Sequence, residues 1–126
     1  MPIVREKDAP AATIEPPYQR TIRVLIDKES VGASNFVLGI AELKPGERGE
    51  EHYHVGTEEA MYVCHGKGVV AIEGDNEHEV SEGYAVFIPS GKKHQLKNMA
   101  NENLKVVWVY SPPGQESRWK ARRPIS

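Results

Sequence analysis

The stretch that decides the fold of this chain is 46-GERGEEHYHVGTEEAMYVCHG-66, taken together with a second stretch, 83-GYAVFIPSGKKHQLKN-98. Glycine and proline bracket the short apolar runs in both stretches at turn positions, which is typical of β-strands joined by tight turns. Together the two stretches supply three histidines and one glutamate, namely His52, His54, His94 and Glu59. Their spacing suits a single metal ion inside a β-barrel, and this is the reason to expect chemistry here.

Strand parity tests this idea from the residues alone. His52 and His54 are two residues apart, so on a strand both side chains leave the same face and can reach one ion. The same rule groups the other two candidates with their neighbours on later strands: Glu59 with Met61 and Val63, and His94 with Leu96 and Asn98. If each of these faces points inward, four ligands converge inside an apolar surround. Glu58 competes with Glu59, but the apolar residues share the face of Glu59.

The donor types indicate which ion fits. Imidazole nitrogens with one carboxylate suit a divalent transition metal such as Mn, Fe, Ni, Co or Zn, whereas Ca²⁺ and Mg²⁺ prefer oxygen ligands. An octahedral ion would keep two positions for water, dioxygen or a chelating substrate. Glu59 would offset one of the two metal charges, so the ion would stay electrophilic and polarise a bound carbonyl. The other histidines, His65 and His78, lie next to turns and are expected to be solvated.

The two stretches resemble the two-part signature of the cupin superfamily at every defining position. In the first, Gly46 is followed by five residues, His52-Tyr53-His54, four residues, Glu59, six residues and Gly66. In the second, Gly83 is followed by five residues, Pro89, one residue, Gly91, two residues, His94, three residues and Asn98. The resemblance implies that His52, His54, Glu59 and His94 are the metal ligands. It implies structural roles for Gly46, Gly66, Gly83, Pro89, Gly91 and Asn98. The chain departs from the pattern at Tyr84, where the family often has Asp.

Size and composition limit the class of protein. The 126 residues fit one domain. The single cysteine, Cys64, excludes an intramolecular disulfide and favours a reducing compartment. The sequence holds no apolar run long enough to cross a bilayer, and a net charge of -2 gives no bulk reason to bind nucleic acid or an anionic membrane. We therefore expect a soluble cytoplasmic protein with neither of these partners.

Proline and glycine divide the chain into three parts. Residues 1–20 carry four prolines, which disfavour a helix and a central strand, so an extended N-terminal arm is predicted there. Short β-type runs are predicted at 21–26, 36–43, 59–63, 69–73, 85–88 and 104–110, with a hairpin turn at 73–77. Without helices between them, these runs predict an all-β antiparallel sandwich or barrel over residues 21–114. The cupin resemblance implies a jelly-roll barrel. Residues 115–126 form the expected C-terminal extension, with Trp119 packed on the barrel or on a neighbour.

The expected pocket wall consists of Met61, Val63, Phe87, Leu96 and Trp108. The last predicted strand leaves one question open, because Trp108 lies on one of its faces and Val107 and Val109 on the other, and both faces are apolar. No second carboxylate, lysine or additional histidine is expected to face inward, so a dedicated general base is not evident. Glu59 itself is the remaining candidate base.

The reaction stays open because cupin sites serve many chemistries. We expect a metal-dependent enzyme acting on a small oxygenated substrate bound to the metal, with dioxygenase-type cleavage slightly favoured. Isomerase or lyase chemistry on sugar-like or keto acid substrates is the alternative within the enzymes. A non-catalytic small-molecule-binding cupin is the alternative from another class. The resemblance also implies a homodimer, since small cupins are commonly homodimers.

Overall fold

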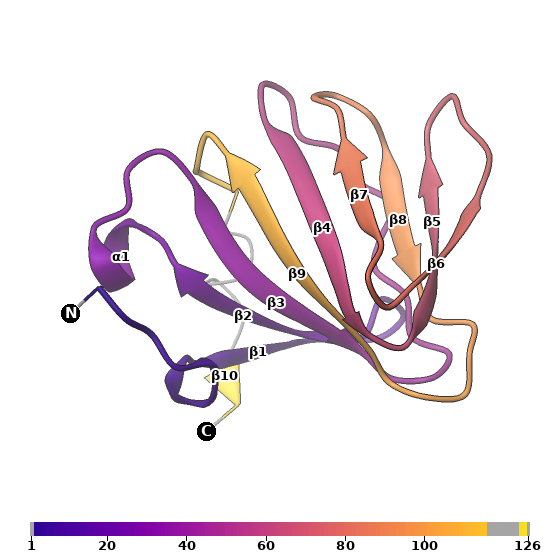
Figure 1. Cartoon of the computed structure of the whole chain (residues 1–126), viewed down its shortest axis with the longest axis horizontal. Coiled ribbons are helices and arrows are strands. Elements are labelled where there is room, and N and C mark those ends of the chain that lie inside the picture. The colour runs from indigo at the N-terminus through magenta and orange to yellow at the C-terminus, as the bar shows by residue number, and fades with distance from the viewer. Residues whose placement is uncertain (1, 116–123, 126) are drawn as a thin grey trace.

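The computed structural model of the chain describes residues 2–115 and 124–125, and these form two antiparallel sheets packed as a jelly-roll sandwich (Figure 1). In chain order the elements are η1 (Glu6–Asp8), β1 (Ala11–Ile14), β2 (Arg20–Ile26), α1 (Lys28–Val31), β3 (Val37–Leu43), β4 (Glu58–His65), β5 (Lys67–Ile72), β6 (His78–Ser81), β7 (Ala85–Ile88), β8 (His94–Lys97), β9 (Leu104–Ser111) and β10 (Pro124–Ile125). The larger sheet has the order β10-β1-β2-β3-β9-β4-β7, and the smaller sheet has the order β6-β5-β8. The prediction of an all-β jelly roll is confirmed, although the two sheets do not close into a continuous barrel.

The six predicted strands correspond to β2, β3, β4, β5, β7 and β9, each within a few residues of its predicted bounds. The predicted turn joins β5 to β6 and contains Gly74 at a φ of 81°. The N-terminal segment, predicted as an extended arm, contains η1 and the strand β1, which pairs with β2 inside the larger sheet. Its prolines flank the strand instead of interrupting it, and Ala11 and Ile14 are buried. The predicted packing of Trp119 lies outside the described residues.

Alternation along the strands places the core between the sheets. On β9, the side chains of Leu104, Val106, Trp108 and Tyr110 are buried, whereas the intervening residues are only half-buried. Val63 on β4 and Val70 on β5 meet them from the two sheets. Each fully buried aliphatic side chain of this kind contributes about 1.5–3 kcal/mol relative to exposure. The apolar alternation that predicted the strands therefore also stabilises their packing.

Two motif residues hold the turns that bring the sheets together. Gly66 separates β4 from β5 with a φ of 85°, and a side chain there would press on the backbone of Asn103. Asn98 is fully buried after β8, and its Nδ2 donates to the carbonyl oxygens of Leu43 at 2.9 Å and Glu102 at 2.8 Å. Its Oδ1 accepts from the backbone N–H of Ala100. Asn98 thus joins the end of β3 to the β8–β9 loop.

Helical structure in the described part of the chain is limited to η1 and α1. Asp27 caps α1, since its side chain accepts from the backbone N–H of Ser30 at 2.8 Å and Ser30 Oγ accepts from the N–H of Asp27. Within residues 2–115 and 124–125, neither helix has the length and apolar character needed to cross a bilayer.

Candidate metal centre and its cavity

The four candidate ligands come from both sheets of the sandwich. Glu59 projects from β4 in the larger sheet, and His94 begins β8 in the smaller one. His52 and His54 lie in the extended segment between β3 and β4, which meets β8 through two isolated bridges, one between Arg48 and Lys97 and the other between His52 and His94. The backbone N–H of each residue in the second bridge donates to the carbonyl of the other, at 3.1 and 2.8 Å. The parity argument assumed a strand at 52–54, and here the backbone is extended and bridged to β8 at His52 without forming a named strand.

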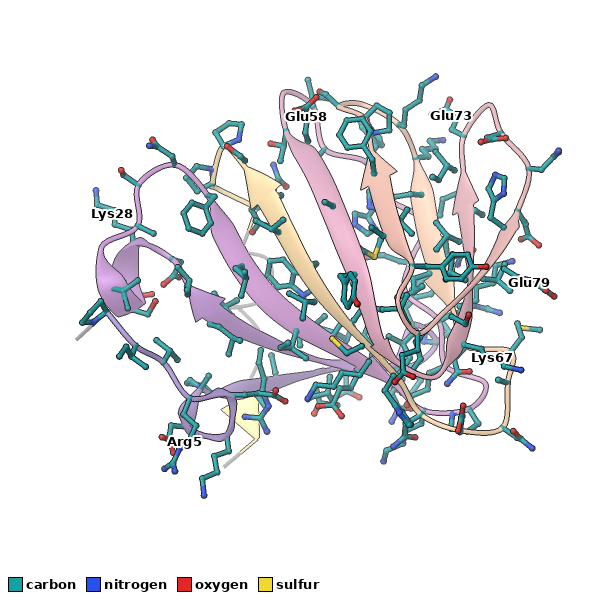
Figure 2. The ribbon with its side chains drawn as sticks, in the orientation of Figure 1. Arg5, Lys28, Glu58, Lys67, Glu73 and Glu79 are labelled. Atoms are coloured by element: carbon teal, nitrogen blue, oxygen red, sulfur yellow. The ribbon has the colours of Figure 1, made fainter. Side chains whose placement is uncertain are left out.

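The structure brings these four side chains, called here the histidine–glutamate cluster, to one point. One potential ligand atom from each residue lies within 4.8 Å of those from the others. Glu59 Oε1 is 3.4 Å from His54 Nε2 and 3.5 Å from His94 Nε2. Donors at such separations surround an ion whose bonds to nitrogen and carboxylate oxygen are about 2.0–2.2 Å long. Glu58, by contrast, is exposed at the rim where β4 begins (Figure 2).

Backbone carbonyls orient two of the imidazoles. His52 Nδ1 lies 2.8 Å from the carbonyl oxygen of Glu50, and His94 Nδ1 lies 3.0 Å from that of Lys92. A carbonyl only accepts, so each Nδ1 carries the hydrogen and each Nε2 keeps a lone pair for a metal. His94 Nε2 and His54 Nδ1 are buried and make no hydrogen bond. A buried polar atom without a partner is costly, and a bound ion would satisfy the lone pair of His94 Nε2.

The protonation states of the cluster match those a metal requires. Burial and the neighbouring His94 lower the pKa of His52 from 6.5 to about 4, so its imidazole is neutral near pH 7. Burial alone would raise the pKa of Glu59, but the adjacent His54 and His94 rings hold it at about 2. Metal ligands must be neutral imidazoles and ionised carboxylates. The low pKa of Glu59 favours a ligand role over a general-base role near neutrality.

The cluster forms part of the wall of a cavity between the sheets. Most of the other lining residues are apolar or aromatic: Ile22, Ala41, Leu43, Met61, Leu96, Val106, Trp108 and Tyr110. The three exceptions are Arg20, Gly49 and Glu50. The rings of Trp108 and Tyr110 stack, with centroids 5.3 Å apart and planes 8° from parallel. The open question about β9 is thereby answered, because Trp108 faces the cavity and Val107 and Val109 face outward.

Two expected pocket residues lie elsewhere. Val63 is fully buried in the core but is not among the residues that line the cavity, although its partner Val106 on β9 is. The expectation for Phe87 is corrected, since its side chain is 57% exposed on the outer side of β7 and lines a different surface groove. Val86 and Ile88 take the inner side of that strand, and Phe87 has the opposite parity.

Two charged residues of the cavity wall were missed. Arg20 is only 5% exposed, and its Nη1 donates to the carbonyl of Tyr18 at 2.9 Å. Arg20 lies two residues before Ile22 on β2, so both side chains point to the same face, and this spacing could have predicted an inward position. A charged residue at the start of a strand is normally expected to be solvated. Glu50 also lines the cavity, although no second carboxylate was expected on the inward faces. Two histidines, His65 and His78, are exposed as predicted, and His78 contacts Asp75 at 3.1 Å.

Three imidazoles and a carboxylate meet at the wall of an apolar cavity inside a jelly roll. This combination is typical of β-sandwich proteins whose pocket can hold a metal ion. The sequence model of the cupin domain matches residues 39–110, which include the whole histidine–glutamate cluster. The chain belongs to the cupin family.

Relatives within this family include proteins of polyketide biosynthesis. The chain is 37% identical over 90 residues to the tetracenomycin polyketide synthase protein TcmJ of Streptomyces glaucescens, covering 71% of this chain and 60% of that protein. It is 34% identical over 101 residues to polyketide synthase CurC of Streptomyces cyaneus, covering 79% of this chain and 65% of CurC. The chain therefore matches less than two-thirds of the length of each. The solved structure of the polyketide cyclase RemF from Streptomyces resistomycificus is 29% identical, with a TM-score of 0.76 over 90% of this chain and 82% of RemF.

Proposed function

We propose that this cupin binds one divalent transition metal through His52, His54, Glu59 and His94 and acts on a small polycarbonyl substrate, as an aromatic polyketide cyclase does. The observation that carries the proposal is the meeting of these four donors at the wall of an apolar cavity with a stacked aromatic pair. The relatives TcmJ, CurC and RemF support the substrate class, because their names place them in polyketide synthesis or cyclisation.

A bound divalent ion would supply Lewis acidity, which polarises a carbonyl and eases loss of a proton from the neighbouring carbon. The residues of the chain supply binding and orientation. The Glu50 and Lys92 carbonyls hold two imidazole rings in place, while Trp108 and Tyr110 offer a flat surface to a planar ligand. Glu50 lines the same cavity and is the proposed proton acceptor. Cyclisation of this kind joins a methylene carbon to a carbonyl carbon and releases water, so no oxidant is needed.

The size of the cavity limits what enters it. About 60 Å³ is open to the centres of water molecules, which is room for a few waters or one small ring. We therefore propose that only the reacting end of a long substrate enters, while the remainder stays at the mouth.

Dioxygenase-type cleavage is the second candidate. It is supported by the two-histidine, one-carboxylate set within the cluster, which is the ligand pattern of non-haem iron oxygenases. Oxygen uptake separates the two candidates, because cyclisation consumes none. Isomerase or lyase chemistry would instead convert sugar-like or keto acid substrates without forming a ring. A non-catalytic binder would bind such compounds tightly and turn over none of them.

The experiment begins with metal analysis of protein purified without added metal, and again after incubation with Zn, Mn, Fe, Ni or Co. We expect one ion per chain, lost in His52→Ala and His94→Ala but retained in His78→Ala, whose histidine is exposed. Metal-loaded protein is then given a linear 1,3,5-triketone, and loss of water is followed by mass spectrometry beside an oxygen electrode. Failure of the wild type to bind any of these ions would overturn the proposal. Oxygen uptake with cleavage of the triketone would favour the second candidate.

We also propose a homodimer formed through the outer side of β4, β7 and β9. Tyr62 and Phe87 are 52% and 57% exposed there, and the half-buried Ala60 and Val109 lie on the same side. Large apolar side chains grouped on neighbouring strands mark interaction surfaces. A second copy of the chain would remove this surface from water.

A further inference from the structure

Trp108 carries a buried hydrogen-bond donor that no part of the described chain accepts. The side chain is 5% exposed, and its Nε1 makes no hydrogen bond. Buried tryptophans usually place their N–H against an acceptor, because leaving it unpaired destabilises the folded state. Trp108 also lines the cavity that holds the histidine–glutamate cluster. A ligand bound in that cavity could supply the missing acceptor.

The indole ring is held in place by its two neighbours. Gly39 lies opposite Trp108 on β3, and the edge of the indole formed by Cε2 and Cζ2 covers Gly39 where a side chain would otherwise stand. Nε1 is bonded to Cε2, so the position of that edge also places the donor. The other contact is the nearly parallel stack on Tyr110. Contacts on both sides thus position the indole within the cavity wall.

The register of β4 and β9 sets the depth of this donor. Glu59 pairs with Tyr110, and Met61 pairs with Trp108. Trp108 is therefore two residues further along the strand pair than the pair that contains Glu59. Two residues along a strand span about 7 Å. A single ring with oxygens on opposite edges covers a similar length. Met61, Leu96 and Val106 line the cavity with side chains that carry no hydrogen-bond donor.

We infer that the indole N–H of Trp108 donates to a second ligand oxygen, so that the cavity selects a flat ring with an oxygen at each end. One end, with one or two adjacent oxygens, faces the histidine–glutamate cluster, and the oxygen at the other edge accepts from Nε1. This inference rests on the proposed function, because it takes the cluster end as the metal end. The ligand class is an aromatic or fully enolised ring with oxygens at both edges, which is narrower than a general polycarbonyl compound. Trp108 is its specificity-determining residue.

The test uses two probes that differ in one oxygen. Tropolone chelates a metal through two adjacent oxygens, and 5-hydroxytropolone adds an oxygen at the opposite edge of the ring. Indole ¹H–¹⁵N signals are recorded for the zinc-loaded protein, which has two tryptophans, and Trp119→Phe assigns them. We expect the Trp108 signal to shift strongly with 5-hydroxytropolone and much less with tropolone. An equal shift with both probes, or none with either at saturation, would overturn the inference.

Affinities of variants give the second readout. Trp108→Phe is expected to weaken 5-hydroxytropolone about tenfold and tropolone less than twofold, because the loss of one hydrogen bond is felt only by the first probe. Replacement of Trp108 by benzothienylalanine, which keeps the ring shape without the N–H, should give the same pattern and serves if Trp108→Phe folds poorly. Equal weakening of both probes would mean that Trp108 acts only by packing. Zinc content is measured in every sample: absence of zinc in the wild type overturns the proposed function and this inference together, whereas normal zinc and tropolone binding without probe discrimination overturns this inference alone.

Discussion

Gly39 and Trp108 lie directly opposite each other on β3 and β9, and the indole ring occupies the space that a β-carbon at position 39 would need. The same indole stacks on Tyr110, whose ring centroid is 6.0 Å from that of His54. A run of ring contacts thus connects a glycine on one strand to the histidine–glutamate cluster. The position of the indole in the cavity wall therefore depends on Gly39 having no side chain, as well as on the stacking with Tyr110.

Substitution of Gly39 by alanine should therefore displace Trp108. We expect a loss of about 1–3 kcal/mol in the free energy of unfolding, as for other overpacked cores. In a Trp108→Leu background the same change should cost less, because the shorter side chain leaves room; part of the cost remains, since the new methyl group also approaches the Arg23 carbonyl. Urea unfolding of the four proteins measures the coupling, and simple additivity of the two changes would contradict this relationship.

Glu59 and Glu58 form a matched pair for testing the metal site. Glu59→Gln keeps the size of the side chain but removes the negative charge from the cluster. Zinc affinity should therefore fall at least about tenfold, because that is the smallest loss usually caused by mutating a residue that only hydrogen-bonds to a metal ligand. Glu58→Gln changes an exposed neighbour and should leave affinity unchanged. Competition with a chromogenic chelator measures both. Equal affinities for the two variants would remove Glu59 from the ligand set.

Asn98 should be among the most sensitive polar residues. Its side chain makes three hydrogen bonds to the backbone and is fully buried. Asn98→Ala leaves two carbonyls and one N–H without this partner, at a cost of at least about 3 kcal/mol if each loses 1 kcal/mol or more. Asn101→Ala, in the exposed part of the following loop, is the control and should change stability by less than about 0.5 kcal/mol. Similar melting temperatures for the two variants would show that the loop relaxes at little cost.

His52 should make the metal-free protein sensitive to mild acid. Its pKa is about 4 in the folded protein, below its ordinary value of 6.5, so the unfolded chain takes up the proton first as the pH falls. The stability linked to this group is complete above pH 6.5 and is lost progressively as the pH falls toward 4, by up to about 3 kcal/mol. Unfolding in urea with a chelator, between pH 7.5 and 4.5, measures it. His52→Gln should flatten this dependence, and an unchanged slope would assign the pH sensitivity to other groups.

The outer surface around Phe87 should control the oligomeric state. Light scattering after size-exclusion chromatography is expected to give the mass of a dimer for the wild type and of a monomer for Phe87→Asp, because a buried charge without a partner opposes association. Val55→Asp introduces the same charge at a position that is 77% exposed in the turn before β4, outside the three strands, and should leave the dimer intact. A monomeric wild type, or a dimeric Phe87→Asp protein, would rule out this interface.

Much of the site could be predicted because it is encoded locally. Two-residue spacing sends His52 and His54 to one side of an extended segment, and apolar neighbours indicate that Glu59 faces the same interior while Glu58 does not. The glycine and proline turns likewise marked the ends of six strands. These features depend only on the geometry of an extended backbone, which is why a sequence pattern carries them.

Packing between strands decided the rest. On β7 and β9 both sides are apolar, so alternation could not say that Phe87 faces outward while Trp108 faces the cavity. Arg20 and Glu50 line the cavity only because the two sheets pack face to face around it. Likewise, β1 belongs to the larger sheet because it pairs with β2. Which surface is inside follows from partners distant in the chain, since burial is a property of the assembled sandwich and not of any one strand.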